Sequence, residues 1–124
     1  MTALAEFIAD FPWGVLLVTD PGSSELIPDW SSPDEMVTAA QSALVVRVRH
    51  ADEGSVAVRV LDAQPETAGE LVFDGILQVS SGSLRVSDAL GDAFVDVPTP
   101  FGSVPVRLFA DEVSEATKIV VVVG

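Results

Sequence analysis

The stretches ALVVRVR (residues 43–49) and SVAVRVLD (residues 55–62) decide the fold class, because apolar side chains recur in them at every second position. Successive side chains of a β-strand point to opposite faces of the sheet, so this alternation predicts two half-buried strands. One face of each strand would carry valine and leucine into a core, and the other face carries arginine. The connection His50–Gly54 between them predicts a hairpin loop.

Six further segments have strand patterns, and clusters of glycine, proline, aspartate and serine separate them. These segments are residues 13–19, 71–79, 84–88, 93–97, 103–109 and 117–123. Short strands without helical crossovers favour a mainly β protein, an antiparallel β-sandwich of about eight strands. The run IVVVV (residues 119–123) is apolar on both faces and predicts a covered, central strand. Gly75 predicts a bulge or a tight bend within its strand.

One or two short helices are expected near the N-terminus. Residues 2–11 carry apolar side chains at a helical spacing. Those side chains are Leu4, Phe7, Ile8 and Phe11. Residues 33–42 begin with a capping box, formed by Ser32 and Glu35, and have Pro33 at the first helical position. The whole chain, residues 1–124, is expected to form a single domain.

The composition is strongly acidic, with 19 aspartates and glutamates, 6 lysines and arginines, and a net charge of −13. Such a surface repels phosphate backbones, and the basic residues are scattered along the chain, so direct nucleic-acid binding is disfavoured. The same charge attracts basic proteins and speeds their encounter. The alternative is that the acidity only keeps a rather apolar protein soluble.

Several classes of chemistry are disfavoured by what the chain lacks. There is no cysteine, which removes disulfides, thiolate catalysis and cysteine-ligated metals. The N-terminus lacks the pattern of a signal peptide, and the apolar runs are too short to cross a bilayer, so we expect no membrane association and a cytoplasmic location. No glycine-rich phosphate motif is present, and no cofactor is expected.

No catalytic or metal site is expected either. His50 is the only histidine, and it lies in a loop beside Asp52, which is typical of a solvated residue rather than a catalytic base. Two groups of acids could be nominated as metal ligands, but neither matches the calcium-loop pattern, and the four-residue spacing of the first does not converge on strands. These groups are Asp88, Asp92 and Asp96, and Asp111, Glu112 and Glu115. Asp88 and Asp92 more plausibly bracket a turn.

The strand patterns also place apolar side chains on outward faces. Phe94 and Phe109 are expected to point away from the core, and Val45, Ala57, Leu61 and Val72 could join them. Such a face would be covered by the helices or by a second copy of the chain. We therefore expect a homodimer whose interface includes Phe94 and Phe109.

The two tryptophans have different expectations. Trp13 opens a predicted strand directly after Pro12 and is expected in the core. Trp30 stands just before the capping box, where it could either pack against the helix start near Met36 or be exposed as an anchor for a partner.

Four stretches resemble the competence protein J family, the small acidic inhibitors of a DNA-entry nuclease. They are IPDWSSPDEMVTAA, ALVVRVR, GILQVSSGSLRVS and FVDVPTPFGSVPVRLF, which together span about residues 13–109. The chain departs from the family in having Ser103 after Gly102, where an aromatic residue is usual. The resemblance implies a β-sandwich that binds and blocks a basic nuclease without catalysis of its own.

Under that hypothesis, the acidic side chains near Trp30 are the first candidates for partner binding, and the loop acids after His50 come second. The first group is Asp29, Asp34 and Glu35, with Trp30 as the anchor. The second group is Asp52 and Glu53. Two other kinds of protein fit the sequence: a structural domain that forms homo-oligomers, and a small-ligand module with a pocket between its sheets.

Overall fold

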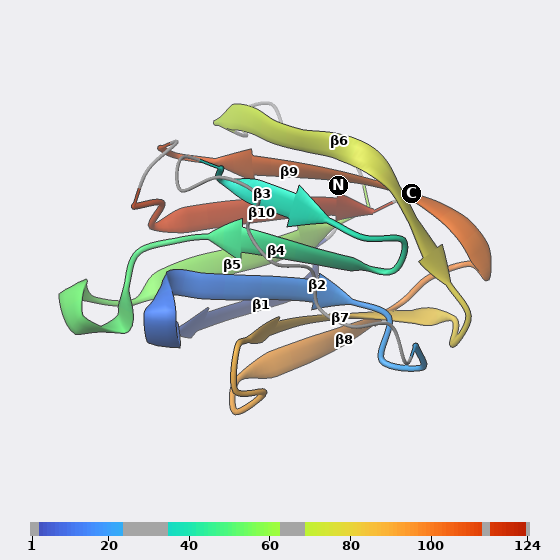
Figure 1. The fold of residues 1–124 in the computed structure, drawn as a ribbon, viewed down its shortest axis with the longest axis horizontal. Coiled ribbons are helices and arrows are strands. Elements are labelled where there is room, and N and C mark those ends of the chain that lie inside the picture. The colour runs from blue at the N-terminus through green and yellow to red at the C-terminus, as the bar shows by residue number, and fades with distance from the viewer. Residues whose placement is uncertain (1–2, 24–34, 63–68, 113–114, 124) are drawn as a thin grey trace.

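The computed structural model describes residues 3–23, 35–62, 69–112 and 115–123, and these form two five-stranded sheets packed against each other (Figure 1). Sheet A has the strand order β1-β5-β10-β9-β6, and sheet B has the order β3-β4-β2-β7-β8. The strands of sheet A are β1 (Ala3–Ala9), β5 (Val56–Leu61), β10 (Lys118–Val123), β9 (Gly102–Ala110) and β6 (Glu70–Val79). Those of sheet B are β3 (Val37–Ala39), β4 (Ala43–Arg47), β2 (Val15–Thr19), β7 (Ser83–Asp88) and β8 (Phe94–Pro98).

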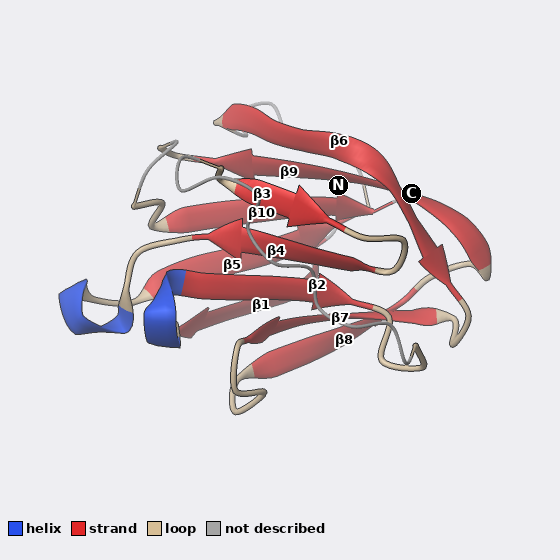
Figure 2. Cartoon of the chain, viewed as in Figure 1, coloured by secondary structure: helices blue, strands red, loops and turns tan. Residues whose placement is uncertain are grey.

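The predicted fold class is confirmed. All eight predicted strands are present in the described residues, and the helical content there is limited to the 3-10 turns η1 (Pro12–Gly14) and η2 (Ala51–Glu53) (Figure 2). The core lies between the inner faces of the two sheets and follows the period of two that the sequence shows. Its members include Leu16, Val18, Leu44 and Val46 from sheet B, and Val56, Val58, Val60 and Val121 from sheet A.

Strand β10 is the middle strand of sheet A, which confirms the prediction of a covered central strand. Ile119, Val121 and Val122 are each at most 1% exposed. β10 runs antiparallel to β9 but parallel to β5, so sheet A is mixed rather than purely antiparallel. Both faces of this strand are covered, as its continuous apolar run requires.

The helix predicted over residues 2–11 is wrong, because the described part of this segment is strand β1. β1 pairs antiparallel with β5, and Ala5, Phe7 and Ala9 pack toward the core. Leu4 and Ile8 lie on the opposite face and are exposed. These two outward apolar residues produced the helical spacing, and the small inward alanines concealed the period of two.

The helix predicted over residues 33–42 is also wrong in its described part. Val37–Ala39 forms β3, which pairs antiparallel with β4, and the hairpin closes where the Ala40 N–H donates to the carbonyl of Ala43 at 2.8 Å. Val37 and Thr38 are β-branched and suit a strand, so pairing with β4 overrides the local capping signal. Ser32 and Pro33 lie outside the described residues.

The connection His50–Gly54 is not a hairpin loop. β4 belongs to sheet B and β5 to sheet A, so this segment carries the chain from one sheet to the other. The predicted bulge in β6 is real but displaced, since the register shift lies between Leu71 and Phe73. Gly75 instead makes room for the ring of Phe73, whose Cζ would lie 2.7 Å from a Cβ at that position.

Two aromatic residues differ from their predicted environments. Trp13, expected in the core, is 67% exposed. Phe109 alternates with Leu108 and Ala110 on β9 and so lies on the outer face of sheet A, yet it is only 4% exposed within the single chain. It therefore offers almost no surface to a second copy, in contrast to the expectation of an interface residue.

Candidate functional site

Trp13 is held outside the core by a tight turn at one end of the sandwich. The Gly14 N–H donates to the Phe11 carbonyl at 2.9 Å, and Pro12 and Trp13 occupy the two central positions. Trp13 has φ 60° and ψ 8°, the left-handed region that the second central position of a type II turn requires and that glycine normally fills. Phe11 is fully buried beneath the turn. The chain thus anchors one aromatic ring and presents the next one to solvent.

This turn is fastened to the segment that precedes η2. Gly14 and Val48 are linked by a hydrogen bond from the Val48 N–H to the Gly14 carbonyl at 2.9 Å, and the Ala51 N–H donates to the Phe11 carbonyl at 3.1 Å. A Cβ on Gly14 would lie 2.8 Å from the Val48 carbonyl oxygen, so only glycine allows this approach. η1 and η2 are therefore a single packed unit at the left of Figure 1.

His50 begins η2 and orders it. Its Nδ1 accepts a hydrogen bond from the Asp52 backbone N–H at 3.1 Å, and the Asp52 carboxylate lies 3.6 Å from the same nitrogen. The Asp52 side chain is 90% exposed. An Nδ1 used in this way positions a loop, which agrees with the interpretation of His50 as a solvated residue.

Glu53 and Glu115 bring two carboxylates together at the same end. A hydrogen bond with Glu115, together with its charge, raises the pKa of Glu53, while Arg49 and His50 act weakly in the opposite direction. Glu115 has φ 54°. Within the described ranges, Trp13 and Glu115 are the non-glycine residues with positive φ, and both lie here. Strained residues of this kind cluster at functional sites more often than chance allows. We call the set Trp13, His50, Asp52, Glu53 and Glu115 the Trp13 end.

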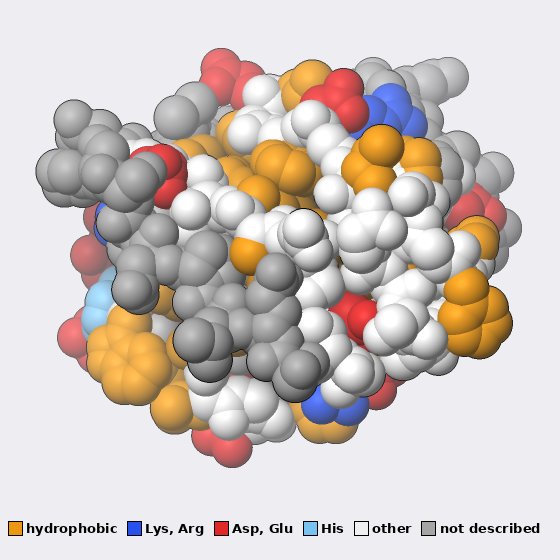
Figure 3. All heavy atoms as spheres, turned by 45° about the vertical axis from the view of Figure 1, so that its right-hand side comes forward, with side chains coloured by type: hydrophobic (Ala, Val, Ile, Leu, Met, Phe, Trp, Pro, Cys, Tyr) orange, Lys and Arg blue, Asp and Glu red, His pale blue; other side chains and the backbone are white. Residues whose placement is uncertain are grey.

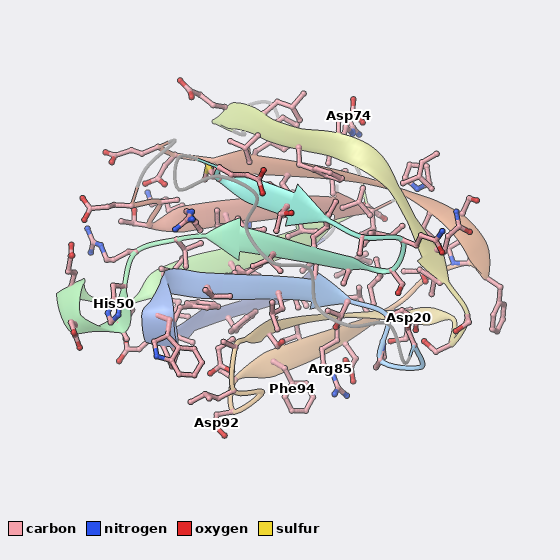
Figure 4. The ribbon with its side chains drawn as sticks, in the orientation of Figure 1. Asp20, His50, Asp74, Arg85, Asp92 and Phe94 are labelled. Atoms are coloured by element: carbon pink, nitrogen blue, oxygen red, sulfur yellow. The ribbon has the colours of Figure 1, made fainter. Side chains whose placement is uncertain are left out.

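The opposite end of the sandwich is built around a buried carboxylate. Asp20 is 3% exposed and accepts hydrogen bonds from the Gly22 N–H at 2.9 Å and from the Ser80 N–H and Oγ at 2.8 Å, and a further one from the Ser81 hydroxyl. Burial alone would raise its pKa, but the hydrogen bonds from Ser81, Ser80 and Gly22 lower the pKa of Asp20 to about 2. We call this region the Asp20 end. Figure 4 shows Asp20 and His50 at opposite ends of the ribbon.

A shallow cleft of about 640 Å³ lies beside Asp20. Its lining includes Ser23, Gln41, Ser42, Gln78 and Ser80. These groups also bond to one another: the Gln78 N–H donates to the Gln41 carbonyl at 2.7 Å, and the Ser23 and Ser42 hydroxyls are 2.8 Å apart. Through these hydrogen bonds the groups that line the cleft hold three segments of the chain together.

Two other aspartates bind their own backbone rather than a ligand. Asp88 Oδ1 accepts from the Leu90 and Asp92 N–H groups at 3.1 and 3.0 Å, which confirms the predicted turn. Asp111 accepts from the Thr117 and Lys118 N–H groups at 2.9 and 3.1 Å. Burial alone would raise the pKa of Asp111, but the hydrogen bonds that it accepts have the larger effect, so its pKa lies below the ordinary value. Among the described residues, no three acidic or histidine side chains are placed to hold a metal ion.

Phe94 is half-exposed on the outer face of β8, as predicted. The Arg85 guanidinium lies over its ring at 4.4 Å and also makes hydrogen bonds to both carboxylate oxygens of Asp96, at 2.8 and 3.1 Å (Figure 4). The hydrogen bond lowers the pKa of Asp96 and raises that of Arg85. Arg85 is thus neutralised and holds the Phe94 ring in place.

The candidate partner-binding residues fall into three groups. Asp29, Trp30 and Asp34 lie outside the described residues. Glu35 is half-buried, and its backbone carbonyl accepts a hydrogen bond from Arg47 Nε at 2.6 Å. Asp52 and Glu53 lie together at the Trp13 end. The sequence analysis missed Trp13 and Glu115 as their neighbours, although the Pro-Trp-Gly order of residues 12–14 is itself a turn signal.

In the part of the chain that the structure describes, no helix is long and apolar enough to cross a membrane. No protein-family model matches the sequence, and no curated protein sequence matches it either. The fold, however, is similar to a solved structure, that of ComJ from Bacillus subtilis, the inhibitor of the DNA-degrading activity of NucA. The TM-score is 0.76, the alignment covers 98% of this chain and 96% of ComJ, and 12% of the aligned residues are identical. The chain therefore has the fold that its resemblance to the competence protein J family implied.

Proposed function

We propose that this protein binds a DNA-degrading nuclease and inhibits it, without catalysis of its own. The observation that supports the proposal most directly is the likeness of the fold to ComJ over nearly the whole of both chains. The likeness concerns the fold, and nuclease inhibition by this chain is our proposal, since one fold can carry many functions.

The charge of the chain supports the same proposal. A nuclease that binds the polyanion DNA needs a cationic cleft, because phosphate contacts supply most of the affinity. A folded chain with a net charge of −13 is attracted to such a cleft and can exclude DNA from it. The chemistry of the described acids agrees with a role in binding, since Asp52 and Glu53 present carboxylates to solvent and no nucleophile–base pair accompanies them.

The test is a titration of NucA with the purified protein while cleavage of duplex DNA is followed. We expect stoichiometric inhibition that weakens by about tenfold or more as salt rises from about 0.05 to 0.3 M, because screening shortens the reach of the charges. The chain unfolded by heat keeps the same net charge and serves as the control. Inhibition by the unfolded chain would indicate a simple polyanion effect, and no inhibition by the folded protein would contradict the proposal.

A further inference from the structure

We propose that the partner docks on an apolar strip at the Trp13 end, made of Trp13, Leu90 and Phe94, and that the acids around this strip recognise a basic surface. This inference rests on the proposed function and names the surface that performs it. It places the contact on η1, the turn after β7 and the start of β8.

The three apolar residues are brought to one region by strand pairing. Leu16 on β2 lies opposite Asp88 on β7, so the turn after Asp88, which contains Leu90, lies next to the turn that carries Trp13. Phe94 lies opposite Ser87, and Ser87 lies opposite Leu17 on β2. All three side chains are well exposed, at 67% for Trp13, 56% for Leu90 and 48% for Phe94.

The strip is surrounded by acidic side chains. Asp52 and Glu53 lie on η2, which packs against the turn of Trp13, and Asp92 lies in the same turn as Leu90, since the N–H groups of both residues donate to Asp88 Oδ1. Figure 3 shows hydrophobic side chains directly beside His50, with acidic groups on both sides of the histidine. Exposed apolar residues with a charged rim are typical of protein interaction sites, and tryptophan is enriched among the residues that dominate them.

The basic groups nearby cancel only part of this charge. Arg85 pairs with Asp96, so these two charges offset each other, and its guanidinium carbon lies 4.4 Å from the centre of the Phe94 ring. Arg49 lies beside η2, near Gly54. Its positive charge lowers the pKa of Glu53, while the carboxylate of Glu115 has the larger, opposite effect. The carboxylate pair Glu53–Glu115 remains mutually repulsive, so an ammonium or guanidinium group from a partner would relieve that repulsion. The charge of the strip's surroundings is therefore complementary to a basic protein and opposed to a second copy of this acidic chain.

The turn itself fixes the backbone at Trp13 before any partner arrives. Phe11 is buried, Gly14 contacts the Val48 carbonyl, and the backbone at Trp13 is held in the left-handed region that non-glycine residues rarely adopt. A backbone that is already ordered loses little conformational entropy on binding. A turn that only connected β1 to β2 would be expected to have glycine, rather than tryptophan, at this position.

The test compares the affinity of NucA for the wild-type protein and for matched variants. We expect Trp13→Ala to weaken binding by about thirtyfold, as a dominant anchor does, and Asp52→Lys to weaken it by about three- to tenfold, mainly through slower association. Trp13→Gly suits the positive φ and should lose the same affinity while keeping the turn, which separates loss of the ring from misfolding.

The controls are an exposed aromatic and an exposed acid elsewhere. Phe101 is 75% exposed and packs over Gly82 beside the serines of the Asp20 end, and Glu6 is exposed on the outer face of β1. Phe101→Ala and Glu6→Lys should each change the affinity by less than about twofold. Equal losses in the control variants would overturn the proposed surface.

The outcomes separate this inference from the function on which it rests. If wild-type protein binds NucA and both Trp13 variants bind it equally well, the strip is not the docking surface, and the proposed function stands. If wild-type protein does not bind NucA, the proposed function itself fails. A wild-type homodimer that Trp13→Gly converts to monomer would show that a second copy covers the strip, which contradicts the inference.

Discussion

Asp20, at one end of the sandwich, accepts four hydrogen bonds from the chain itself, whereas Glu53, at the other end, faces a second carboxylate. The first arrangement lowers the pKa of a carboxyl group, and the second raises it. A lowered pKa means that the folded state stabilises the charged form, and a raised pKa means that it does not. The Asp20 carboxylate therefore stabilises the fold, whereas the Glu53 carboxylate does not and remains available for other contacts.

The backbone differs in the same direction. At the Asp20 end, the positive φ of Gly82 is carried by glycine, as low strain requires. At the Trp13 end, Trp13 and Glu115 adopt positive φ without being glycine. Local strain and like-charge repulsion at one end, set against a fully bonded carboxylate at the other, agree with our proposal that the partner is recognised at the Trp13 end.

The largest expected effect is the loss of stability in Asp20→Asn. The amide keeps the shape of the side chain but removes the charge that four donors face, so the free energy of unfolding at pH 7 should fall by about 2–3 kcal/mol. Urea denaturation measures this difference. Asp52→Asn, a matched change at the Trp13 end, should stay within about 0.5 kcal/mol of wild type. Equal effects of the two variants would remove the contrast between the ends.

The pH dependence of the same pair sharpens the comparison. The pKa of Asp20 falls from its ordinary value of 3.8 in the unfolded chain to about 2 in the folded protein, so its contribution is complete above about pH 5 and disappears as the pH falls through 2. That contribution amounts to about 2 kcal/mol. The stability difference between wild type and Asp20→Asn should therefore shrink between pH 5 and pH 2, and a difference that stays constant would contradict this assignment.

The fold could be predicted from the sequence only in part. Eight strands were predicted, because most of them show the period of two that burial of one face produces. β1 and β3 were missed because their pairing partners, β5 and β4, decide their conformation, and local helical signals were present in both. The central place of β10 followed from an apolar run on both faces.

The candidate site shows the same limit. Asp52 and Glu53 are neighbours in the sequence and could be proposed together. Glu115 reaches Glu53 only through the fold, and the serines that bind Asp20 lie 60 and 61 positions away. Trp13 was misassigned because a tryptophan at the start of an apolar run normally enters the core. Pro12 and Gly14, on the two sides of Trp13, indicated a turn, but the apolar character of the tryptophan was given more weight in the prediction.

A smaller effect of opposite sign is expected from Trp13→Gly. Glycine removes the cost of positive φ but gives the unfolded chain more freedom, so the free energy of unfolding should rise by about 0.5 kcal/mol. Chemical denaturation again measures it. The adjacent change Gly14→Ala should destabilise the protein, because its Cβ would lie 2.8 Å from the Val48 carbonyl oxygen at φ 66°. A loss of more than about 1 kcal/mol in Trp13→Gly would show that the exposed ring stabilises the fold.

The smallest expected effect is in Glu53→Gln, which removes one partner of the carboxylate pair. Because the pKa of Glu53 is raised in the folded protein, its charge opposes folding above that pKa, and the opposition disappears as the pH falls below the ordinary value of 4.5. Thermal melts at pH 7 in low salt should therefore give Glu53→Gln a slightly higher melting temperature than the wild-type protein. The gain should vanish in about 0.5 M salt, where exposed charges are screened.

Glu70→Gln, at an exposed glutamate on β6, removes the same charge from another part of the surface. It separates a local repulsion from the general effect of lowering the net charge, so its gain should be the smaller one. If the two variants gain equally, the Glu53–Glu115 pair has no special cost. If Glu53→Gln gains more in stability while it loses affinity for NucA, the same repulsion that weakens the free fold is the one that a basic partner relieves, and the two ends of the molecule differ for a functional reason.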